Sequence, residues 1–170
     1  GKLLVAAADC TGHGVAGAFM SMIGIALINQ IINEKGTTEP SIILEQLNEG
    51  IITALKQRKS EMNEGMDIAF CTIDKKNGNM QFSGANRPLW LIRNKEFLSF
   101  KPTKMPIGGQ QVNKSEGFLQ HHINLQPGDA LYLFSDGYAD QFGGEKGKKF
   151  MIKNLRETLL TINHLPMKEQ

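Results

Sequence analysis

Cysteine is scarce in this sequence, and the two that occur lack the spacing of a zinc site or a disulfide framework. They are Cys10 and Cys71. Small extracellular domains usually depend on several paired cysteines to hold their fold. The sequence therefore fits the reducing cytoplasm, and we expect a cytoplasmic location, with any membrane anchor supplied by another domain of the parent protein.

An excess of charge of one sign is also missing. The 19 basic and 17 acidic residues give a formal net charge of +2, and the basic residues form no stripe, which argues against a nucleic-acid partner. The N-terminus of the sequence lacks the basic-then-apolar pattern of a signal peptide, and we find no apolar run of membrane-spanning length without interruption, no internal repeat and no low-complexity segment. What remains is the composition of one globular domain, 41% hydrophobic and 21% charged.

The order of the predicted elements favours an α+β fold. An apolar strand at 2–9 precedes a helix at 14–34, which is apolar nearly all round and therefore expected to be packed on two sides. An amphipathic helix follows at 41–58. The later elements are two hairpins, two strands and a last helix, at 66–74 with 79–85, 88–93 with 96–101, 117–125, 130–135 and 149–162. We expect an antiparallel β-sandwich flanked by helices.

Two aspartates end predicted strands and directly precede glycine-rich turns or loops. Asp9 ends the first strand, Asp136 ends the strand at 130–135, and Asp140 lies one helical turn beyond Asp136. Carboxylates brought together at a strand rim repel each other unless a cation intervenes, and Mg²⁺ or Mn²⁺ suits oxygen ligands. Taken singly, such an aspartate is more often a turn former, His13 is a loop histidine, and Asp67 is a strand-start cap.

One glycine pattern offers another interpretation. Residues 12–17 read G-x-G-x-x-G after a strand and before a helix, which is the outline of a dinucleotide-binding turn. A dinucleotide-binding unit needs a second parallel strand about 30 residues later, and a helix is predicted there instead. The glycines fit better as a tight loop around an ion.

Five ordered segments carry a resemblance to a known family. Residues 9–22 read DCTGHGVAGAFMSM, which resembles the D-x-T-G-H-G-x-x-G-A-x-M-S motif of SpoIIE-like phosphatases, relatives of the metal-dependent type 2C protein phosphatases. The other similar segments are GMDIAF at 65–70, GANRPL at 84–89, MPIG at 105–108, and the run from Gly128 to Gly137. Together they span roughly residues 3 to 150, which is why the resemblance is specific.

The resemblance implies a site and a reaction. Asp9 would be shared by two Mn²⁺ or Mg²⁺ ions, the Cys10 carbonyl and Asp136 would be further ligands, and Asp140 a weaker candidate. Arg87 and His13 are candidate substrate-binding residues. The implied activity is hydrolysis of phosphoserine or phosphothreonine by a metal-activated water, and no C-x₅-R motif supports cysteine-based phosphatase chemistry. The alternative is a non-catalytic regulatory module with the same fold.

The resemblance also implies that residues 1–170 are one phosphatase domain truncated at both ends. The family's acidic G-G-D motif on a preceding strand and its D-D motif on a final strand do not occur here. We therefore expect this chain alone to hold metal poorly and to be nearly inactive. The implied partners are a phosphorylated regulator such as an anti-sigma-factor antagonist, an upstream sensor domain, and a second copy in a homodimer.

Overall fold

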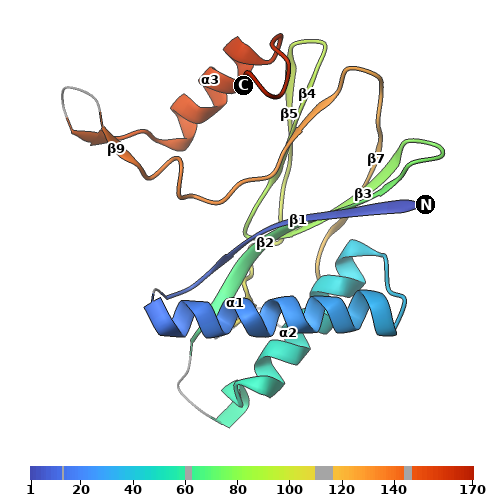
Figure 1. Ribbon diagram of the computed structural model, residues 1–170, viewed down its shortest axis with the longest axis vertical. Helices are drawn as coiled ribbons and strands as arrows, with labels where there is room; N and C mark the ends of the chain where they lie inside the picture. Colours follow the sequence, from blue (N-terminus) through green and yellow to red (C-terminus); the bar gives the residue numbers. More distant parts are fainter. Residues whose placement is uncertain (13, 60–62, 110–116, 144–146) are drawn as a thin grey trace.

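The computed structural model describes residues 1–12, 14–59, 63–109, 117–143 and 147–170, and its architecture is α+β (Figure 1). Its elements in chain order are β1 (Lys2–Cys10), α1 (Gly14–Asn29), the π-helical turn η1 (Gln30–Glu34), α2 (Pro40–Ala54), the 3₁₀ turn η2 (Gln57–Lys59), β2 (Gly65–Asp74), β3 (Asn79–Ala85), β4 (Leu89–Arg93), β5 (Glu96–Phe100), β6 (Ile107–Gly108), β7 (Gln120–Asn124), β8 (Ala130–Tyr132), β9 (Phe142–Gly143), β10 (Lys148–Lys149) and α3 (Ile152–Ile162).

The strands form two main antiparallel sheets and one small hairpin. The first sheet has the order β1-β2-β3-β7, with β6 added to β2, and the second has the order β5-β4-β8. Strands β9 and β10 pair with each other. Helices α1 and α2 lie on one side of the first sheet, while β4, β5 and α3 lie on the other (Figure 1). The predicted antiparallel sheets with flanking helices are confirmed.

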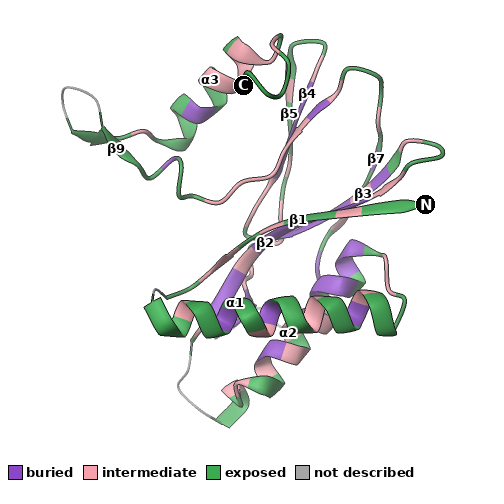
Figure 2. Ribbon diagram, in the orientation of Figure 1, coloured by how far each residue is buried: buried purple, intermediate pink, exposed green. Residues whose placement is uncertain are grey.

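Strand β2 is buried on both faces and supplies side chains to two separate cores. Ile68 and Phe70 belong to the cluster beneath the helices, whereas Ala69 and Cys71 belong to the cluster with Phe82, between the sheets. This alternation follows from the two-residue repeat of a strand. It explains why β2 reads as a continuous apolar run and why it lies inside its sheet (Figure 2).

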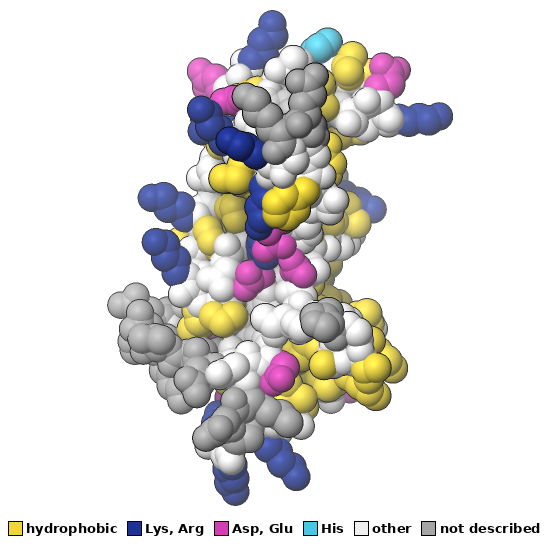
Figure 3. All heavy atoms as spheres, turned by 90° about the vertical axis from the view of Figure 1, so that its left-hand side faces the viewer, with side chains coloured by type: hydrophobic (Ala, Val, Ile, Leu, Met, Phe, Trp, Pro, Cys, Tyr) yellow, Lys and Arg dark blue, Asp and Glu magenta, His cyan; other side chains and the backbone are white. Residues whose placement is uncertain are grey.

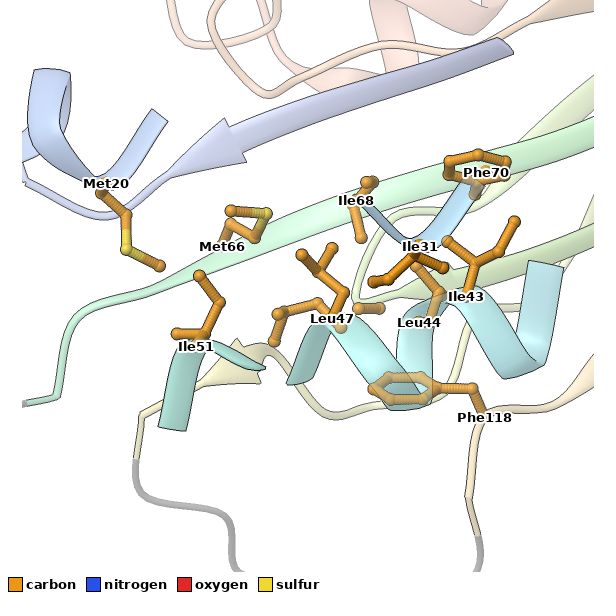
Figure 4. Close-up of a cluster of buried hydrophobic side chains, with 12 residues drawn as sticks. Met20, Ile31, Ile43, Leu44, Leu47, Ile51, Met66, Ile68, Phe70 and Phe118 are labelled. Carbon is orange, nitrogen blue, oxygen red and sulfur yellow. The ribbon is translucent and has the colours of Figure 1, made fainter. Parts of the chain in front are cut away.

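Helix α2 carries the predicted apolar stripe. Four of its side chains are fully buried against the first sheet, facing β2 (Figure 4), namely Ile43, Leu44, Leu47 and Ile51. Each contributes about 1.5–3 kcal/mol by leaving water. The α-helix ends at Ala54, earlier than the predicted 58, because Lys56 adopts a left-handed conformation with φ of 51°.

Helix α1 differs from the expectation of packing on two sides, and that expectation was wrong. Within the described chain only Met20 and Gly24 are buried on this helix, with Gly24 lying close to the Met66 side chain. The opposite stripe is exposed, including Val15 and Phe19 at 73% and 60%. An apolar composition shows that both sides of a helix could be buried. Burial of both sides requires two packing surfaces, and the described residues provide only one.

One helical segment also has the length and composition of a membrane span. Residues Gly14–Glu34 contain an 18-residue window of mean hydropathy 1.9, of which 17% is buried. A mostly buried core helix passes the same test, whereas this helix is mostly exposed and has one face against the first sheet, where Gly24 lies close to the Met66 side chain.

The later strands are shorter than predicted. The expected strands at 117–125 and 130–135 are reduced to β7 and β8, and residues 133–135 continue past β8 without a described ladder partner. Both predicted hairpin turns are present. Gly78 has a positive φ of 71°, and Asn94 and Lys95 are both left-handed, as a two-residue hairpin turn requires.

Candidate functional site

The end of β1 and the start of β2 bring two carboxylates together. Asp9 and Asp67 are direct partners in the antiparallel register. Residues that lie directly opposite in such a pair point to the same face of the sheet, with their Cβ atoms about 5 Å apart. Two negative charges are therefore neighbours at the rim of the first sheet.

Thr11 and three glycines fix the loop that follows Asp9. The Thr11 amide donates to the Gly65 carbonyl at 2.9 Å, and the Gly65 amide donates back to the Thr11 hydroxyl at 2.7 Å. Gly12 has a φ of 90°, and a Cβ on Gly17 would lie 2.9 Å from the Gly12 carbonyl oxygen. The loop therefore passes tightly over the start of α1, and the D-x-T-G-x-G-x-x-G spacing has a structural cause.

The turn after β3 delivers a cation to the same rim. A Cβ on Gly84 would lie 2.2 Å from the Arg87 carbonyl oxygen, so the turn closes only around glycine. Asn86 adopts a left-handed conformation with φ of 58°, and its side-chain amide donates to Asp67 at 2.8 Å. This arrangement points Arg87 at the carboxylates.

One nitrogen of Arg87 is surrounded by three carboxylates. The Nη2 atom lies 2.7 Å from Asp136, 3.2 Å from Asp9 and 3.3 Å from Asp67, measured to the Oδ2 atom of each. Acidic side chains gather beside basic ones near the middle of the face in Figure 3. The structure thus joins the end of β1, the segment that follows β8, the start of β2 and the turn after β3 in one cluster.

The pKa values of Asp9 and Asp136 shift in opposite directions, although Asp136, predicted to end a strand, lies four residues beyond the end of β8. Burial and then the charge of Asp136 raise the pKa of Asp9, against the opposing effect of Arg87. The hydrogen bond from Arg87 lowers the pKa of Asp136, which is the more exposed of the two. The Arg87 side chain is 15% exposed, and its Nε is buried without a partner among the described residues. The guanidinium is therefore not fully satisfied in this position.

The donor set fits a divalent metal ion in its chemistry. Mn²⁺ and Mg²⁺ prefer oxygen ligands, and three carboxylates around one guanidinium leave a formal excess of negative charge. As the described side chains stand, no three acidic, histidine or cysteine groups have the spacing that holds an ion. The guanidinium nitrogen fills the point on which the three carboxylates converge. Asp9, Asp67 and Asp136 are the residues that would hold the ion.

The other predicted site residues are placed differently. The Asp140 carboxylate accepts from Lys149 at 3.0 Å, away from Arg87, although its amide donates to the Asp136 carbonyl at 2.8 Å. Cys10 ends β1, and its thiol accepts a hydrogen bond from the Ser21 hydroxyl. Ligation by Asp140 and by the Cys10 carbonyl stays a prediction. His13 lies outside the described residues.

Two residues of this site, Asp67 and Asn86, are not predicted from the sequence. Asp67 was interpreted as a possible strand cap, but it is the cross-strand partner of Asp9. The strand register reveals this role, and the sequence did not fix that register, because 2–9 and 66–74 are both nearly continuous apolar runs without a clear alternation.

The fold places the protein in the class of type 2C (PP2C) phosphatase folds. The family model for stage II sporulation protein E (SpoIIE) matches residues 1–170, and the chain belongs to that family. No curated protein matches the sequence closely enough to count as a relative.

Several solved structures are similar to this chain. The PP2C domain of SiaA from Pseudomonas aeruginosa has a TM-score of 0.84 at 28% identity, over 98% of this chain and 63% of that one. SpoIIE from Bacillus subtilis, as its PP2C domain with a fragment of the regulatory domain, has 0.63 at 23%, over 82% and 38%. The catalytic domain of PstP, in complex with two manganese ions, has 0.63 at 17%, over 96% and 74%. The chain therefore spans less than two thirds of the first two.

Proposed function

We propose that the domain containing this chain is a protein serine/threonine phosphatase that depends on Mn²⁺ or Mg²⁺. The observation that carries the proposal is the convergence of Asp9, Asp67 and Asp136 on one point at the rim of the first sheet. The family and the PP2C fold support it, as does the manganese in the PstP structure.

Different residues of the chain would bind the cation, position the Asp9 loop and bind the phosphate group. Asp9, Asp67 and Asp136 would hold the cation, and Thr11 keeps the Asp9 loop in place. The chemistry that the ion supplies when bound is the activation of water and the neutralisation of phosphate charge. Arg87 provides a planar guanidinium at the same rim, which suits two parallel hydrogen bonds to a phosphate group.

The test is hydrolysis of a phosphoserine peptide and of p-nitrophenyl phosphate by the full-length protein, in Mn²⁺ and in chelator. Asp136→Asn should lower the rate by about 10²-fold or more, because a neutral amide holds the cation poorly. Glu49→Gln, on an exposed pair with Arg58, is the matched control and should keep the rate. Equal rates in chelator, or in Asp136→Asn, contradict the metal mechanism. A folded protein that binds Mn²⁺ without turnover is the alternative, a non-catalytic module.

We extend the proposal to the setting of the domain. The substrate would be a phosphorylated regulatory protein such as an anti-sigma-factor antagonist, in the cytoplasm, and an upstream sensor domain would control the activity in a homodimer. Membership of the SpoIIE family supports this setting. Incubating the full-length protein with the phosphorylated antagonist and measuring phosphate release tests the choice of substrate against other phosphoproteins.

A further inference from the structure

Arg87 holds a position that a divalent cation would also take. Its Nη2 atom has one oxygen from each of three carboxylates at 2.7–3.3 Å. A Mg²⁺ ion at the same point would draw those oxygens to about 2.0–2.1 Å. The ion and the nitrogen therefore cannot occupy this point together.

The hydrogen bonds of the guanidinium show how it is held. An Nη nitrogen carries two protons, which is one fewer than the carboxylates around it. Asp9 and Asp136 receive hydrogen bonds from Arg87, whereas Asp67 receives its hydrogen bond from Asn86. Asp67 is thereby held in position independently of Arg87 and would remain if the guanidinium moved.

The other end of the guanidinium is poorly satisfied. The buried Nε has no partner among the described residues, and an unpaired buried donor is unfavourable. Arg93 offers a contrast within the same chain, because its Nε and Nη2 both donate to Asp129. Arg87 neutralises the carboxylates without the complete set of bonds that would fix it there.

We propose that Arg87 is a built-in counter-ion that competes with the divalent metal for Asp9, Asp67 and Asp136. The inference rests on the proposed function for the identity of the ion. Without metal, the guanidinium relieves the repulsion between the three carboxylates. When the metal binds, it displaces the guanidinium, which then becomes available to the phosphate group of a substrate. Arg87 thus links metal entry to substrate binding.

The test is calorimetric titration of Mn²⁺ into the full-length protein, with no phosphate present. Arg87→Gln should bind Mn²⁺ roughly tenfold more tightly or better, since a unit charge within 4 Å of the site opposes the ion in the wild type. Arg87→Lys should lie between the two. Arg58→Gln removes one exposed positive charge, which pairs with Glu49 and not with the three carboxylates, and should leave the affinity unchanged. Equal or weaker binding by Arg87→Gln overturns the inference, as does an absence of binding in both proteins.

If Arg87→Gln fails to fold, a second measurement on the wild-type protein tests the same inference. In wild-type protein the NMR signal of the Arg87 Nε–H, assigned through bonds from the Arg87 backbone amide, should shift on titration with Mg²⁺ as the guanidinium leaves the carboxylates. A signal that stays fixed while Mg²⁺ binds overturns the inference. Measuring turnover distinguishes a failure of this inference from a failure of the proposed phosphatase function. Metal-dependent hydrolysis with a fixed Arg87 sinks only the inference, and displacement of Arg87 without hydrolysis sinks only the phosphatase proposal.

Discussion

Two arginine–aspartate centres in this protein have opposite designs. Arg93 pairs with a single carboxylate, Asp129, through two hydrogen bonds and donates a third to the Asn124 carbonyl, and the Asp129 side chain is only 4% exposed. Arg87 faces three carboxylates with an unpaired Nε. Matched charges with complete bonding are typical of a structural pair. Unmatched charges with incomplete bonding are typical of a site that awaits a ligand.

The largest expected effect on stability is at the matched centre. Asp129→Ala leaves the Arg93 guanidinium half-buried without its partner and removes the acceptor of the Gln126 amide. We expect the free energy of unfolding to fall by about 3 kcal/mol. Denaturant unfolding monitored by circular dichroism measures it. Asp9→Asn is the comparison variant, and a similar loss there would erase the distinction between the two centres.

Lowering the pH should change the stability contributions of Asp129 and Asp9 in opposite directions. Arg93 lowers the pKa of Asp129, so its contribution is present above the ordinary value of 3.8 and is lost as the pH falls through the lowered pKa. The raised pKa of Asp9 acts oppositely, because the protonated carboxyl favours the folded state and that contribution is lost as the pH rises through the raised pKa.

Unfolding free energies measured in chelator from pH 7 to below pH 3 test these signs. Asp129→Asn should lose less stability on acidification than the wild type, and Asp9→Asn should lose more. Parallel curves for the three proteins would show that neither centre governs the acid response.

The smallest effect is expected at Asp140. Its ion pair with Lys149 is exposed on both sides, at 43% and 54%, and such pairs contribute at most about 1 kcal/mol. Asp140→Asn should therefore leave the unfolding midpoint nearly unchanged. Titrating Mn²⁺ into this variant sharpens the comparison. Unchanged Mn²⁺ affinity would show that Asp140 does not bind the metal and stays paired with Lys149. A clear loss of affinity would show that its carboxylate turns towards Asp136 when metal binds.

Much of the fold could be predicted from local sequence patterns, because turns and amphipathic helices depend mainly on neighbouring residues. The Asn77-Gly78 turn and the apolar stripe of α2 are decided by backbone conformation and by one buried face. The exposure of α1 could not be predicted in this way, since it depends on how many surfaces the rest of the chain offers. Strand lengths near Asp136 were overestimated because apolar residues continue past the last ladder pair.

The site was only partly accessible to sequence reasoning. Asp9 and Asp136 could be found because each interrupts an apolar run at a glycine turn. The role of Asp67 could be recognised only once the pairing of β1 with β2 was known. The contacts of Arg87 with the carboxylates could be recognised only once the path of the turn after β3 was known. An arginine beside a proline carries no mark of its three partners, which come from segments far apart in the chain.

The close packing around Gly84 has a consequence for how this sequence is able to vary. Any side chain there would meet the Arg87 carbonyl, the Phe82 ring and Pro102, at 2.2, 2.9 and 3.0 Å. Phe82 belongs to the core and Arg87 to the rim, so the absence of a side chain at Gly84 allows the packing of both. Selection for a folded chain and selection for a working site would therefore preserve the same glycine, and its persistence among descendants could not be credited to either pressure alone.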